Sequence, residues 1–499
     1  MYIIFLFSEM THIEHTHLGD TTPLLAGPPQ ITVYKRRWYI LLIFSLVAIL
    51  QDTVWNTWGP IDHTAIFLYG WTHDLIALFA NYGSILYVVA FIPAVYVLER
   101  SVRNAMLFCS GFMAFGTILR CGFLQDPYIS QKVFTVSCHI CSILNGMSNI
   151  VVGSAPLAIS AVWFPPEERV TATTIAQVFN GLGTGMSFLL ASQIVRPIDD
   201  MIPNLNSTVP DEELHALEQD IQWYMYSNAI PAAVLFILII AYFPSAPAKP
   251  PSVSSYQARL DFMTGFKEVM KSPAAWLIAI GCSIPQGIVV AWTAMMVVNL
   301  TEICVGNTCL TQNWVNYLGI YATVVSTIAA IFVARAADNI KGKLKEAIIV
   351  LLCLAAVVFF MLCLISIGVF QFGDILYVKI AVYFLLLTGN SLVVSSMPLA
   401  MELAMEICYP AAEGVVGGWI SIWFNIATVV FLSLFGIPGI GTSWLDYVLP
   451  LSCVVAIPFI LPIKVEYRRM MMDMNREVNI HQRPEINTEA NKYGSTGIH

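Results

Sequence analysis

Long apolar stretches separated by short polar segments run through the whole sequence, and this pattern predicts a bundle of membrane-spanning helices. A helix that crosses the hydrocarbon core of a bilayer needs roughly 20 apolar residues. Twelve stretches reach about this length, without the alternation of apolar and polar residues that is typical of membrane β-strands. They are residues 38–59, 75–98, 105–124, 134–163, 171–195, 225–243, 274–300, 315–335, 346–370, 376–400, 415–435 and 445–463.

The composition supports an integral membrane protein. Hydrophobic residues make up 57% of the 499 residues and charged residues 11%, whereas soluble domains have about 25% charged residues. The mean hydropathy of +0.72 is too high for a surface that faces water. The net charge of −8 gives no sign of a nucleic-acid partner.

The distribution of Lys and Arg predicts the orientation, because these residues gather on the cytosolic side of membrane proteins. If the N-terminus is cytosolic, all 24 of them lie on that side except Arg120, Lys132, Arg196 and Lys379. The predicted order is a cytosolic tail (1–36), a six-helix bundle (37–243), a cytosolic loop (244–273), a second six-helix bundle (274–463) and a cytosolic tail (464–499).

Two features of the opposite side agree with this orientation. Asn206 begins the triplet Asn-Ser-Thr, an acceptor for N-glycosylation, in the loop after the fifth stretch. Cys304 and Cys309 lie in the loop after the seventh stretch, on the oxidising side, where they can form a small disulfide.

An internal repeat relates the two bundles. The segment FPPEERVTATTIAQVFN (164–180) matches YPAAEGVVGGWISIWFN (409–425) in its aromatic-Pro start, its Glu, its Val and its final Phe-Asn. Two parallel repeats of six helices are typical of the major facilitator architecture, in which two pseudo-symmetric bundles enclose a site near the middle of the membrane. We therefore expect an all-α membrane protein with this fold and with both termini in the cytosol.

Charged residues in the cytosolic turns are candidates for a gate between the bundles. The segment LERSVR (98–103) and its counterpart ARAADNIKGK (334–343) add to the two repeat segments. The alternative is that these loop charges only follow the excess of Lys and Arg on the cytosolic side and have no gating role. For Arg103 taken alone, this alternative is preferred. The candidate gating residues are Glu99, Arg103, Glu168, Arg169, Arg335, Asp338, Glu406 and Glu413.

Polar residues within the spans predict a binding cavity, because such residues are costly in lipid and usually face a cavity or a neighbouring helix. An aromatic and amide-rich wall with few fixed charges suits a small or flat organic solute better than a phosphate or dicarboxylate. The candidate substrate ligands are Trp55, Asn56, Asn145, Asn180, Gln286, Trp292, Asn390 and Asn425, and further polar residues in the same spans include Asn149 and Gln177.

Two carboxylic acids are candidates for proton coupling. Asp52 lies in the first span, where burial would favour its neutral form on an acidic side and ionisation on the cytosolic side. An aspartate that points into a water-filled vestibule, or that pairs with a neighbour, is the alternative. Glu402 in the tenth span is the second candidate.

The tails carry a sorting signal and little other chemistry. In DTTPLL, Asp20 precedes the pair Leu24 and Leu25, the form of signal that binds clathrin adaptors and directs membrane proteins to lysosomes. Three His residues between 12 and 17 have no rigid scaffold for a metal. We find no metal cluster, nucleophile triad or phosphate-binding loop, and so expect neither cofactor nor enzyme activity.

Several motifs resemble solute carrier family 49. They are VWNTWGPI (54–61), SAPLAISAVWFPPEERVTATTIA (154–176) and MPLAMELAMEICYPAAEG (397–414), and the resemblance covers about residues 36–465. YFPSAPAKPPSVSS (242–255) and ARAADNIKGKLK (334–345) resemble the branch of disrupted in renal carcinoma protein 2.

This resemblance implies export of pyridoxine, a form of vitamin B6, from the lysosomal lumen together with protons. In the related feline leukaemia virus receptor-related transporters, the Trp that corresponds to Trp55 stacks on the substrate, and a Gln stands where this chain has Asn425. That branch implies the alternative, facilitated transport of choline, ethanolamine or another organic cation at the plasma membrane, with haem a weaker third substrate. A receptor or scaffold without transport is the alternative from a different class, and we expect a monomer.

Overall fold

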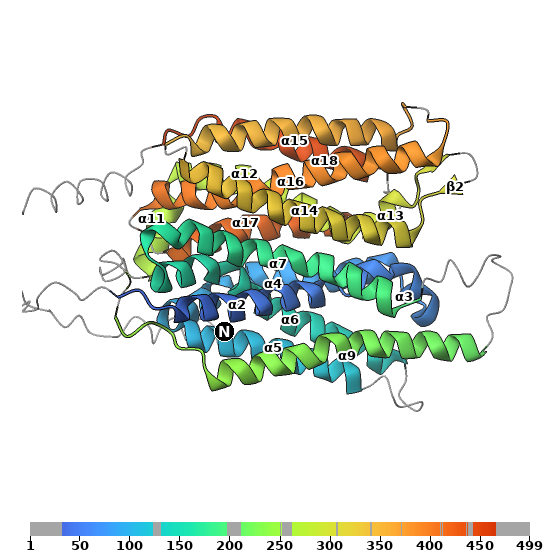
Figure 1. Cartoon of the computed structure of the whole chain (residues 1–499), viewed down its shortest axis with the longest axis horizontal. Coiled ribbons are helices and arrows are strands. Elements are labelled where there is room, and N and C mark those ends of the chain that lie inside the picture. The colour runs from blue at the N-terminus through green and yellow to red at the C-terminus, as the bar shows by residue number, and fades with distance from the viewer. Residues whose placement is uncertain are drawn as a thin grey trace, which may run out of the picture.

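The computed structural model describes residues 32–122, 131–196, 211–249, 251, 262–305, 308–339, 342–370, 372–409, 411, 413–435, 437 and 443–465. Its long helices lie side by side along the long axis of the molecule and form two groups (Figure 1). The first half of the chain makes one group, and the second half makes the other.

The first group contains six long helices with two short elements after the first of them. They are α2 (Arg36–Trp55), followed by η1 (Gly59–Ile61) and α3 (Asp62–Tyr69), then α4 (His73–Arg100), α5 (Val102–Gly122), α6 (Gln131–Trp163), α7 (Pro166–Ile194) and α9 (Asp211–Ala241).

The second group also contains six long helices. It comprises α12 (Pro273–Ala294), α13 (Met296–Leu300), the strands β1 (Cys304–Val305) and β2 (Thr308–Cys309), then α14 (Gln312–Asn339), α15 (Leu344–Ser366), α16 (Ile375–Cys408), α17 (Glu413–Leu434) and α18 (Leu445–Ile460). The short helix α11 (Phe262–Lys271) precedes α12, within the segment that the sequence predicts as a loop.

Each predicted apolar stretch corresponds to one long helix, but several helices extend beyond it. The helix α9 begins at Asp211, well before the predicted start at 225, because its polar first turns continue the helix outside the apolar region. The helix α16 continues to Cys408 instead of ending near 400. Within the described residues, ten helices are long and apolar enough to cross a membrane. The helix α18 is shorter, and α7, rich in Thr and Gly, is not among the ten, so the count of twelve crossings stays a prediction.

The two groups meet along two seams. Helix α7 packs against α14, and α4 packs against α17, with α6 also touching α17. The same helices lie at the boundary between the two groups in Figure 1. In each seam, the second helix of one group packs against the fifth helix of the other group. The cavity described below lies between these seams.

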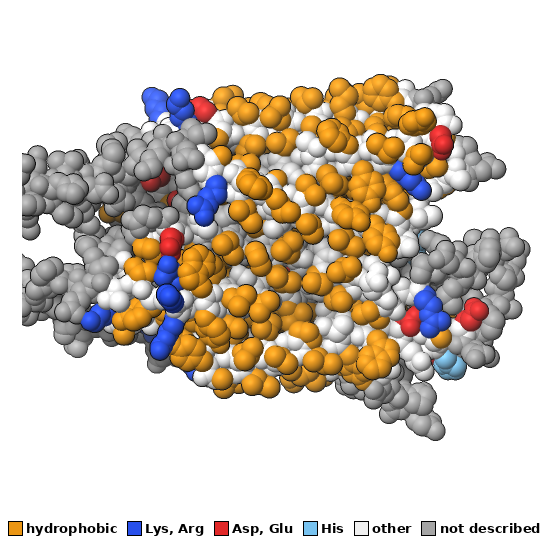
Figure 2. Space-filling model, in the orientation of Figure 1, with side chains coloured by type: hydrophobic (Ala, Val, Ile, Leu, Met, Phe, Trp, Pro, Cys, Tyr) orange, Lys and Arg blue, Asp and Glu red, His pale blue; other side chains and the backbone are white. Residues whose placement is uncertain are grey.

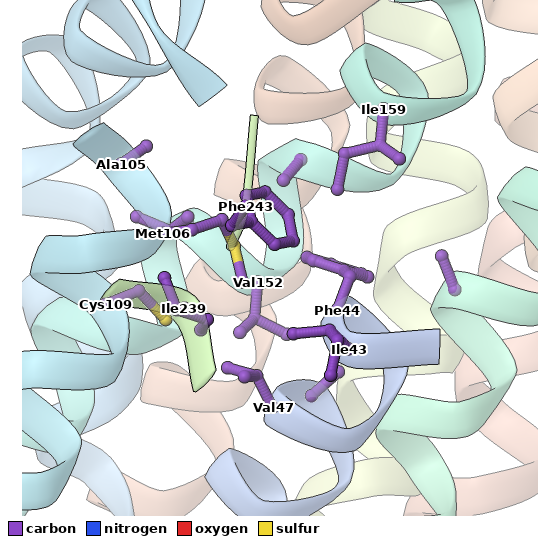
Figure 3. Packing of buried hydrophobic residues seen from close by; sticks show 14 of the residues in the cluster. Ile43, Phe44, Val47, Ala105, Met106, Cys109, Val152, Ile159, Ile239 and Phe243 are labelled. Carbon is purple, nitrogen blue, oxygen red and sulfur yellow. The ribbon is translucent and has the colours of Figure 1, made fainter. Parts of the chain in front are cut away.

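Apolar packing holds each group together. In the first group, one buried cluster joins α2, α5, α6 and α9, and includes Phe44, Met106, Val152 and Ile239 (Figure 3). Large apolar side chains also cover the outside of the molecule, and the Lys and Arg side chains visible in Figure 2 gather mainly near the end where α2 begins. A broad apolar belt with charges at its ends is the surface expected of a protein surrounded by lipid.

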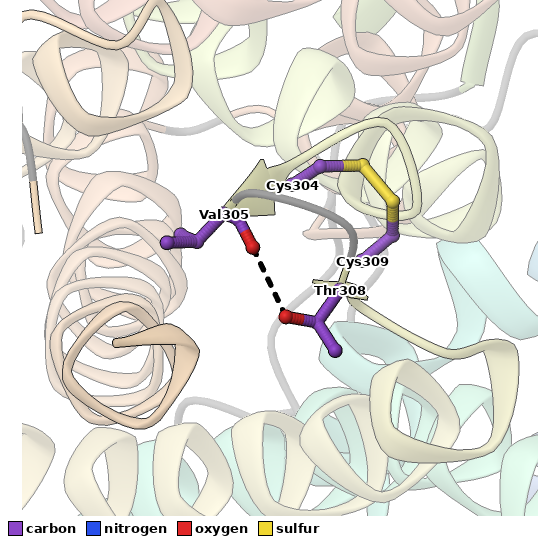
Figure 4. Close-up of a disulfide and its surroundings, with 4 residues drawn as sticks. All are labelled: Cys304, Val305, Thr308 and Cys309. Atoms are coloured by element: carbon purple, nitrogen blue, oxygen red, sulfur yellow. Dashed lines mark hydrogen bonds between the residues drawn. A yellow bond between two sulfur atoms is a disulfide. The ribbon is translucent and has the colours of Figure 1, made fainter. Parts of the chain in front are cut away.

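On the opposite end, Cys304 and Cys309 form a disulfide (Figure 4). The bond closes the turn between β1 and β2, where the hydroxyl of Thr308 donates to the carbonyl of Val305 at 3.0 Å. This small hairpin connects α13 to α14 on the side that the sequence predicts to be non-cytosolic.

Candidate functional site: a polar cavity between the two bundles

A central cavity of about 150 Å³ lies between the two groups of helices. Its lining comes from both groups: α2, α4, α6 and α7 on one side, and α12, α14, α16 and α17 on the other. Six of the ten residues predicted for substrate binding or proton coupling line it: Asp52, Trp55, Asn180, Gln286, Asn390 and Asn425. Asn149 and Gln177 line it as well.

The first bundle contributes the charged part of the lining. The hydroxyl of Thr184 on α7 donates to Oδ2 of Asp52 on α2 at 2.5 Å. The close approach of the two helices makes this contact possible. A Cβ at Gly183 would lie 2.2 Å from the carbonyl oxygen of Ile49, so only glycine fits at this crossing.

Trp55 and Asn180 are held in fixed orientations beside Asp52. The indole Nε1 of Trp55 donates to the carbonyl of Ala80 at 2.8 Å, which orients the ring between α2 and α4. The amide of Asn180 donates to the carbonyl of Ala48 at 3.0 Å. These bonds tie α4 and α7 to α2, so the first bundle presents one rigid wall to the cavity.

The second bundle contributes neutral polar groups. The amide nitrogen of Asn425 donates to the carbonyl of Ser421 at 2.8 Å, and this bond leaves its Oδ1 without a partner. Gln286 also has a buried oxygen without a hydrogen bond. Buried amide oxygens without a partner are rare, because leaving one unpaired costs about 1–3 kcal/mol. In a cavity wall, such an oxygen can accept a hydrogen bond from a ligand or from water, whereas the same feature at Asn145 and Gln312 lies between helices.

The hydroxyl face of α14 was not predicted from the sequence. Thr323, Ser326 and Thr327 all line the cavity. Their spacing places them on one face of a helix. Three hydroxyls at this spacing inside an apolar span are a signal that sequence reasoning can use, but none of the predicted ligands comes from this span.

A second cavity of about 130 Å³ adjoins the first toward the end where α4 and α6 finish. The two share Asn149, Gln177, Asn180, Gln286 and Asn425. Pro156 of α6 and Pro398 of α16 line the second cavity. They occupy matching places in the segments SAPLA and SMPLA of the two halves. A proline inside a helix kinks it, so the pair shapes this cavity symmetrically.

Three predicted ligands lie away from both cavities, and in the structure they pack between helices instead. Asn56 donates to the hydroxyl of Ser187 at 2.9 Å. Asn145 donates to the carbonyl of Gln51 at 3.1 Å. The side chain of Trp292 is 3% exposed and belongs to an apolar cluster of the second bundle. Whether a polar side chain of a helix faces the cavity or a neighbouring helix depends on the rotation of the helix about its axis. Packing against the neighbouring helices sets this rotation.

Hydrogen bonds join the two bundles at the end of the cavity that the sequence predicts to be non-cytosolic. The carbonyl of Pro60 in η1 accepts from Nε2 of Gln312 at 2.6 Å and from Nδ2 of Asn316 at 3.3 Å, both on α14. In the other seam, Asn81 of α4 donates to the hydroxyl of Ser433 of α17 at 3.2 Å. None of these residues was among the gating candidates, which all came from the cytosolic turns.

On the side predicted to be cytosolic, Glu99 is a gating candidate that reaches the other bundle. Its carboxylate lies against the start of α17, and a Cβ at Gly414 would be 2.2 Å from Oε1 of Glu99. A carboxylate near the first turn of a helix is favoured by the positive end of the helix dipole. Phe91 of α4 is buried in the same seam, in an apolar cluster with Val415 and Trp419 of α17.

Other gating candidates make contacts within the first bundle. Glu168 accepts two hydrogen bonds from Arg37, at 2.9 and 3.0 Å. Arg103 donates to the carbonyls of Ile240 and Phe243 at the end of α9, and Arg169 to the carbonyl of Phe164. These contacts stabilise the turns of one bundle, and none of them joins the two bundles.

Five further candidates for gating or proton coupling come from helices α14, α16 and α17 of the second bundle. Arg335 is exposed, and Glu402 and Glu406 are partly buried near the end of α16, outside the residues that line the two cavities. The backbones of Asp338 and Glu413 lie in α14 and α17, and their side chains are outside the description. Asp20, Leu24, Leu25 and Asn206 lie outside the described residues. Within the described part of the chain, no group of three or more His, Cys, Asp or Glu side chains could hold a metal ion.

Comparisons with known proteins agree with this architecture. The sequence profile of the Major Facilitator Superfamily matches residues 35–432. Among solved structures, a fucose:proton symporter of E. coli has a TM-score of 0.57 at 13% identity, covering 84% of this chain and 98% of the symporter. A bacterial homologue of the human lysosomal transporter Spinster, in an inward-facing conformation, has a TM-score of 0.56 at 13% identity, covering 86% and 96%. The chain therefore belongs to the Major Facilitator Superfamily and has its fold.

Curated relatives narrow the family further. A solute carrier family 49 member 4 homolog of Xenopus tropicalis is 30% identical, covering 93% of this chain and 99% of the relative. The mouse choline/ethanolamine transporter FLVCR1 is 25% identical, covering 83% of this chain and 72% of the relative. The protein is thus a multi-pass membrane protein of solute carrier family 49, as the motifs of its sequence predict.

Proposed function

We propose that this protein carries a small organic solute across the lysosomal membrane by alternating access. Its principal activity in this proposal is the proton-coupled export of pyridoxine to the cytosol. The central cavity carries the proposal. Side chains of both bundles converge there, Asp52 and Trp55 from one and Gln286 and Asn425 from the other. A solute bound between the bundles can be released to either side when they rock against one another.

The contacts that close the cavity suit such a rocking motion. On the non-cytosolic side they are hydrogen bonds to the carbonyl of Pro60, the bond from Asn81 to Ser433, and apolar packing of Phe188 against the second bundle. Each of these contacts joins one bundle to the other, so a rocking motion has to break them on one side of the cavity. On the cytosolic side, the packing of Glu99 against Gly414 forms the matching closure.

The lysosomal location and the substrate rest on the family relationship and on the N-terminal signal. The relatives of the member 4 type match over nearly their whole length. Asp20 with Leu24 and Leu25 provides an adaptor-binding signal. Asp52 lines the cavity and is the acidic residue through which we propose that the proton gradient acts on transport, whereas Glu402 lies outside the cavity and is the weaker candidate.

Transport by purified protein in vesicles tests the proposal directly. Labelled pyridoxine should move out of vesicles faster when their lumen is acidic than when both sides are at neutral pH. Binding without transport under every gradient would instead support a receptor. Transport that ignores the pH gradient would contradict proton coupling and leave a facilitative carrier.

A second candidate function is facilitated transport of choline or ethanolamine at the plasma membrane. It is favoured by the similarity to FLVCR1, whose name states that activity, and by Trp55 in the cavity wall. Localisation of the tagged full chain separates the two. The first proposal expects lysosomes, with a shift to the plasma membrane when Leu24 and Leu25 are both changed to Ala; a plasma-membrane location of the unchanged protein favours the second.

A further inference from the structure

The ionisable lining of the central cavity is confined to one residue. In the described part of the chain, Asp52 is the single acidic side chain that lines it, and no Lys, Arg or His side chain does so. From α7, Thr184 faces Asp52; from α4 and α6 the cavity receives Ser84 and Asn149, which do not titrate. Tyr87 lines the adjoining cavity, where its hydroxyl pairs with that of Ser154 at 2.8 Å. An ionised Asp52 therefore has no cationic side chain beside it in this lining.

Most hydroxyl hydrogens around the cavity are already used. The hydroxyls of Thr293, Thr323, Ser326 and Thr428 donate to backbone carbonyls of their own or a neighbouring helix. Thr184 donates to Asp52. A hydroxyl that donates its hydrogen still has lone pairs, so these side chains can accept a hydrogen bond from a solute while they keep their own bonds.

Buried amide oxygens add to this set of acceptors. Oε1 of Gln177, Oε1 of Gln286 and Oδ1 of Asn425 are buried and have no hydrogen-bond partner. The bond from Asn425 to Ser421 fixes which atom of that amide is the oxygen. The three residues line both cavities and come from α7, α12 and α17. A solute with hydrogen-bond donors can pair with these oxygens, and the amide nitrogens of the two Gln residues can donate in turn.

We infer that the cavity binds its solute as a cation with hydrogen on its nitrogen, with Asp52 as the counterion, so that solute and proton cross the membrane as one particle. A ring nitrogen takes up a proton in an acidic lumen, and the resulting N–H donates to the carboxylate. In the less acidic cytosol the nitrogen loses the proton, and the neutral solute leaves. This inference rests on the proposed transport function and specifies how its proton is carried.

The inference assigns Asp52 a role in specificity that differs from that of a proton carrier. If the carboxylate itself carried the proton, a permanent cation such as choline would also be accompanied by a proton when transported. If the solute carries it, choline moves without a proton, because its nitrogen has no hydrogen. Trp55 is three residues further along the same helix, where its ring can lie against the cation.

Binding to the detergent-solubilised full chain tests the counterion. Labelled pyridoxine should bind more tightly to the wild type at pH 5 than at pH 7.5. The Asp52→Asn variant keeps the size of the side chain, and it should lose about ten- to a hundredfold of the affinity at pH 5 and most of the pH dependence. Glu346→Gln, which neutralises an exposed carboxyl group in the first turn of α15, away from both cavities, should keep the pH dependence. A wild-type pH profile in Asp52→Asn would overturn the inference.

Proton flux in proteoliposomes gives a second readout. A pH-sensitive dye in the lumen should report loss of protons during pyridoxine export and no proton movement during choline transport. Protons moving with choline would overturn the inference and identify a carrier on the protein. Ethanolamine, which has N–H groups, serves as a probe if pyridoxine is not bound. Ethanolamine binding that depends on Asp52 would support the counterion while refuting the pyridoxine proposal, and the absence of binding by either probe would refute the inference.

Discussion

On the side of the first bundle, the cavity wall holds a carboxylate and an indole ring that are fixed by bonds to neighbouring helices; on the side of the second bundle, it holds amides and hydroxyls without charge. The charged wall depends on one close helix crossing at Gly183, whereas the neutral wall is spread over α12, α14, α16 and α17. Under the proposal, the first wall sets which charge is accepted, and the second adjusts how firmly the solute is held. Changes to the first should have the larger effects.

The largest effect is expected from Gly183→Ala. The added methyl group would overlap the carbonyl of Ile49 and the Cβ of Asp52, so α2 and α7 must separate. A displacement of the order of 1 Å at a site can cost about a hundredfold in rate, and we expect a loss of transport of about that size.

Gly181→Ala is the matched control for the effect on stability, because Gly181 itself lines the cavity. It lies on the same helix, and a Cβ there would meet no atom within 4 Å. Thermal unfolding of the two variants should show Gly181→Ala near the wild type or slightly above it, and Gly183→Ala below it by about 1–3 kcal/mol. Equal stability and transport in both variants would show that the crossing is not needed.

Trp55→Ala should have the next largest effect. Removing the ring takes away an interaction with a cation that is worth about 0.5–2 kcal/mol, which corresponds to a loss of roughly 2- to 30-fold in solute affinity. Trp55→Phe keeps a ring but loses the bond to Ala80, so it should fall between the wild type and Trp55→Ala. Equilibrium binding measures all three, and an unchanged affinity in Trp55→Ala would remove the ring from the site.

Asn425→Leu tests the neutral wall. The change removes an unpartnered acceptor at similar side-chain size, and a hydrogen bond of about 0.5–1.5 kcal/mol corresponds to roughly two- to twelvefold in affinity. The pH dependence of binding should stay as in the wild type, since the charged wall is intact. A changed pH profile would contradict the division of roles between the two walls.

Thr323→Val should have the smallest effect. The hydroxyl already donates to the carbonyl of Gly319, so a solute can use only its remaining lone pair. We expect the binding constant to change by less than about threefold. A much larger loss would mean that α14 holds the solute more directly than the amides of α12 and α17 do.

Most of the fold could be predicted from the sequence, because long apolar stretches and a repeated segment can be recognised in the sequence itself. The count of twelve membrane crossings stays a prediction. The helix ends were less accurate. The polar turns at the start of α9 and the break after Trp55, followed by η1 and α3, depend on packing outside the apolar region. The pairing of α7 with α14 and of α4 with α17 follows from the symmetry of the repeat.

The site could be predicted only in part. A polar residue inside a span must face a cavity or a neighbouring helix, and sequence cannot distinguish the two. Asn180 and Asn425 line the cavity, whereas Asn56 and Asn145 pair with neighbouring helices. The closure at Pro60 was missed because a backbone carbonyl has no sequence signature.

The central claim is that the solute passes through a cavity between the two bundles. The most direct test of this claim is whether a cysteine in the variant Asn390→Cys is accessible to a thiol reagent. The side chain lies on α16 in the lining of the central cavity. A small hydrophilic thiol reagent, applied to the full chain in vesicles with the wild type as background, should label this cysteine during transport, and pyridoxine should protect it. A cysteine that stays unlabelled, or that no solute protects while transport continues, would contradict the account.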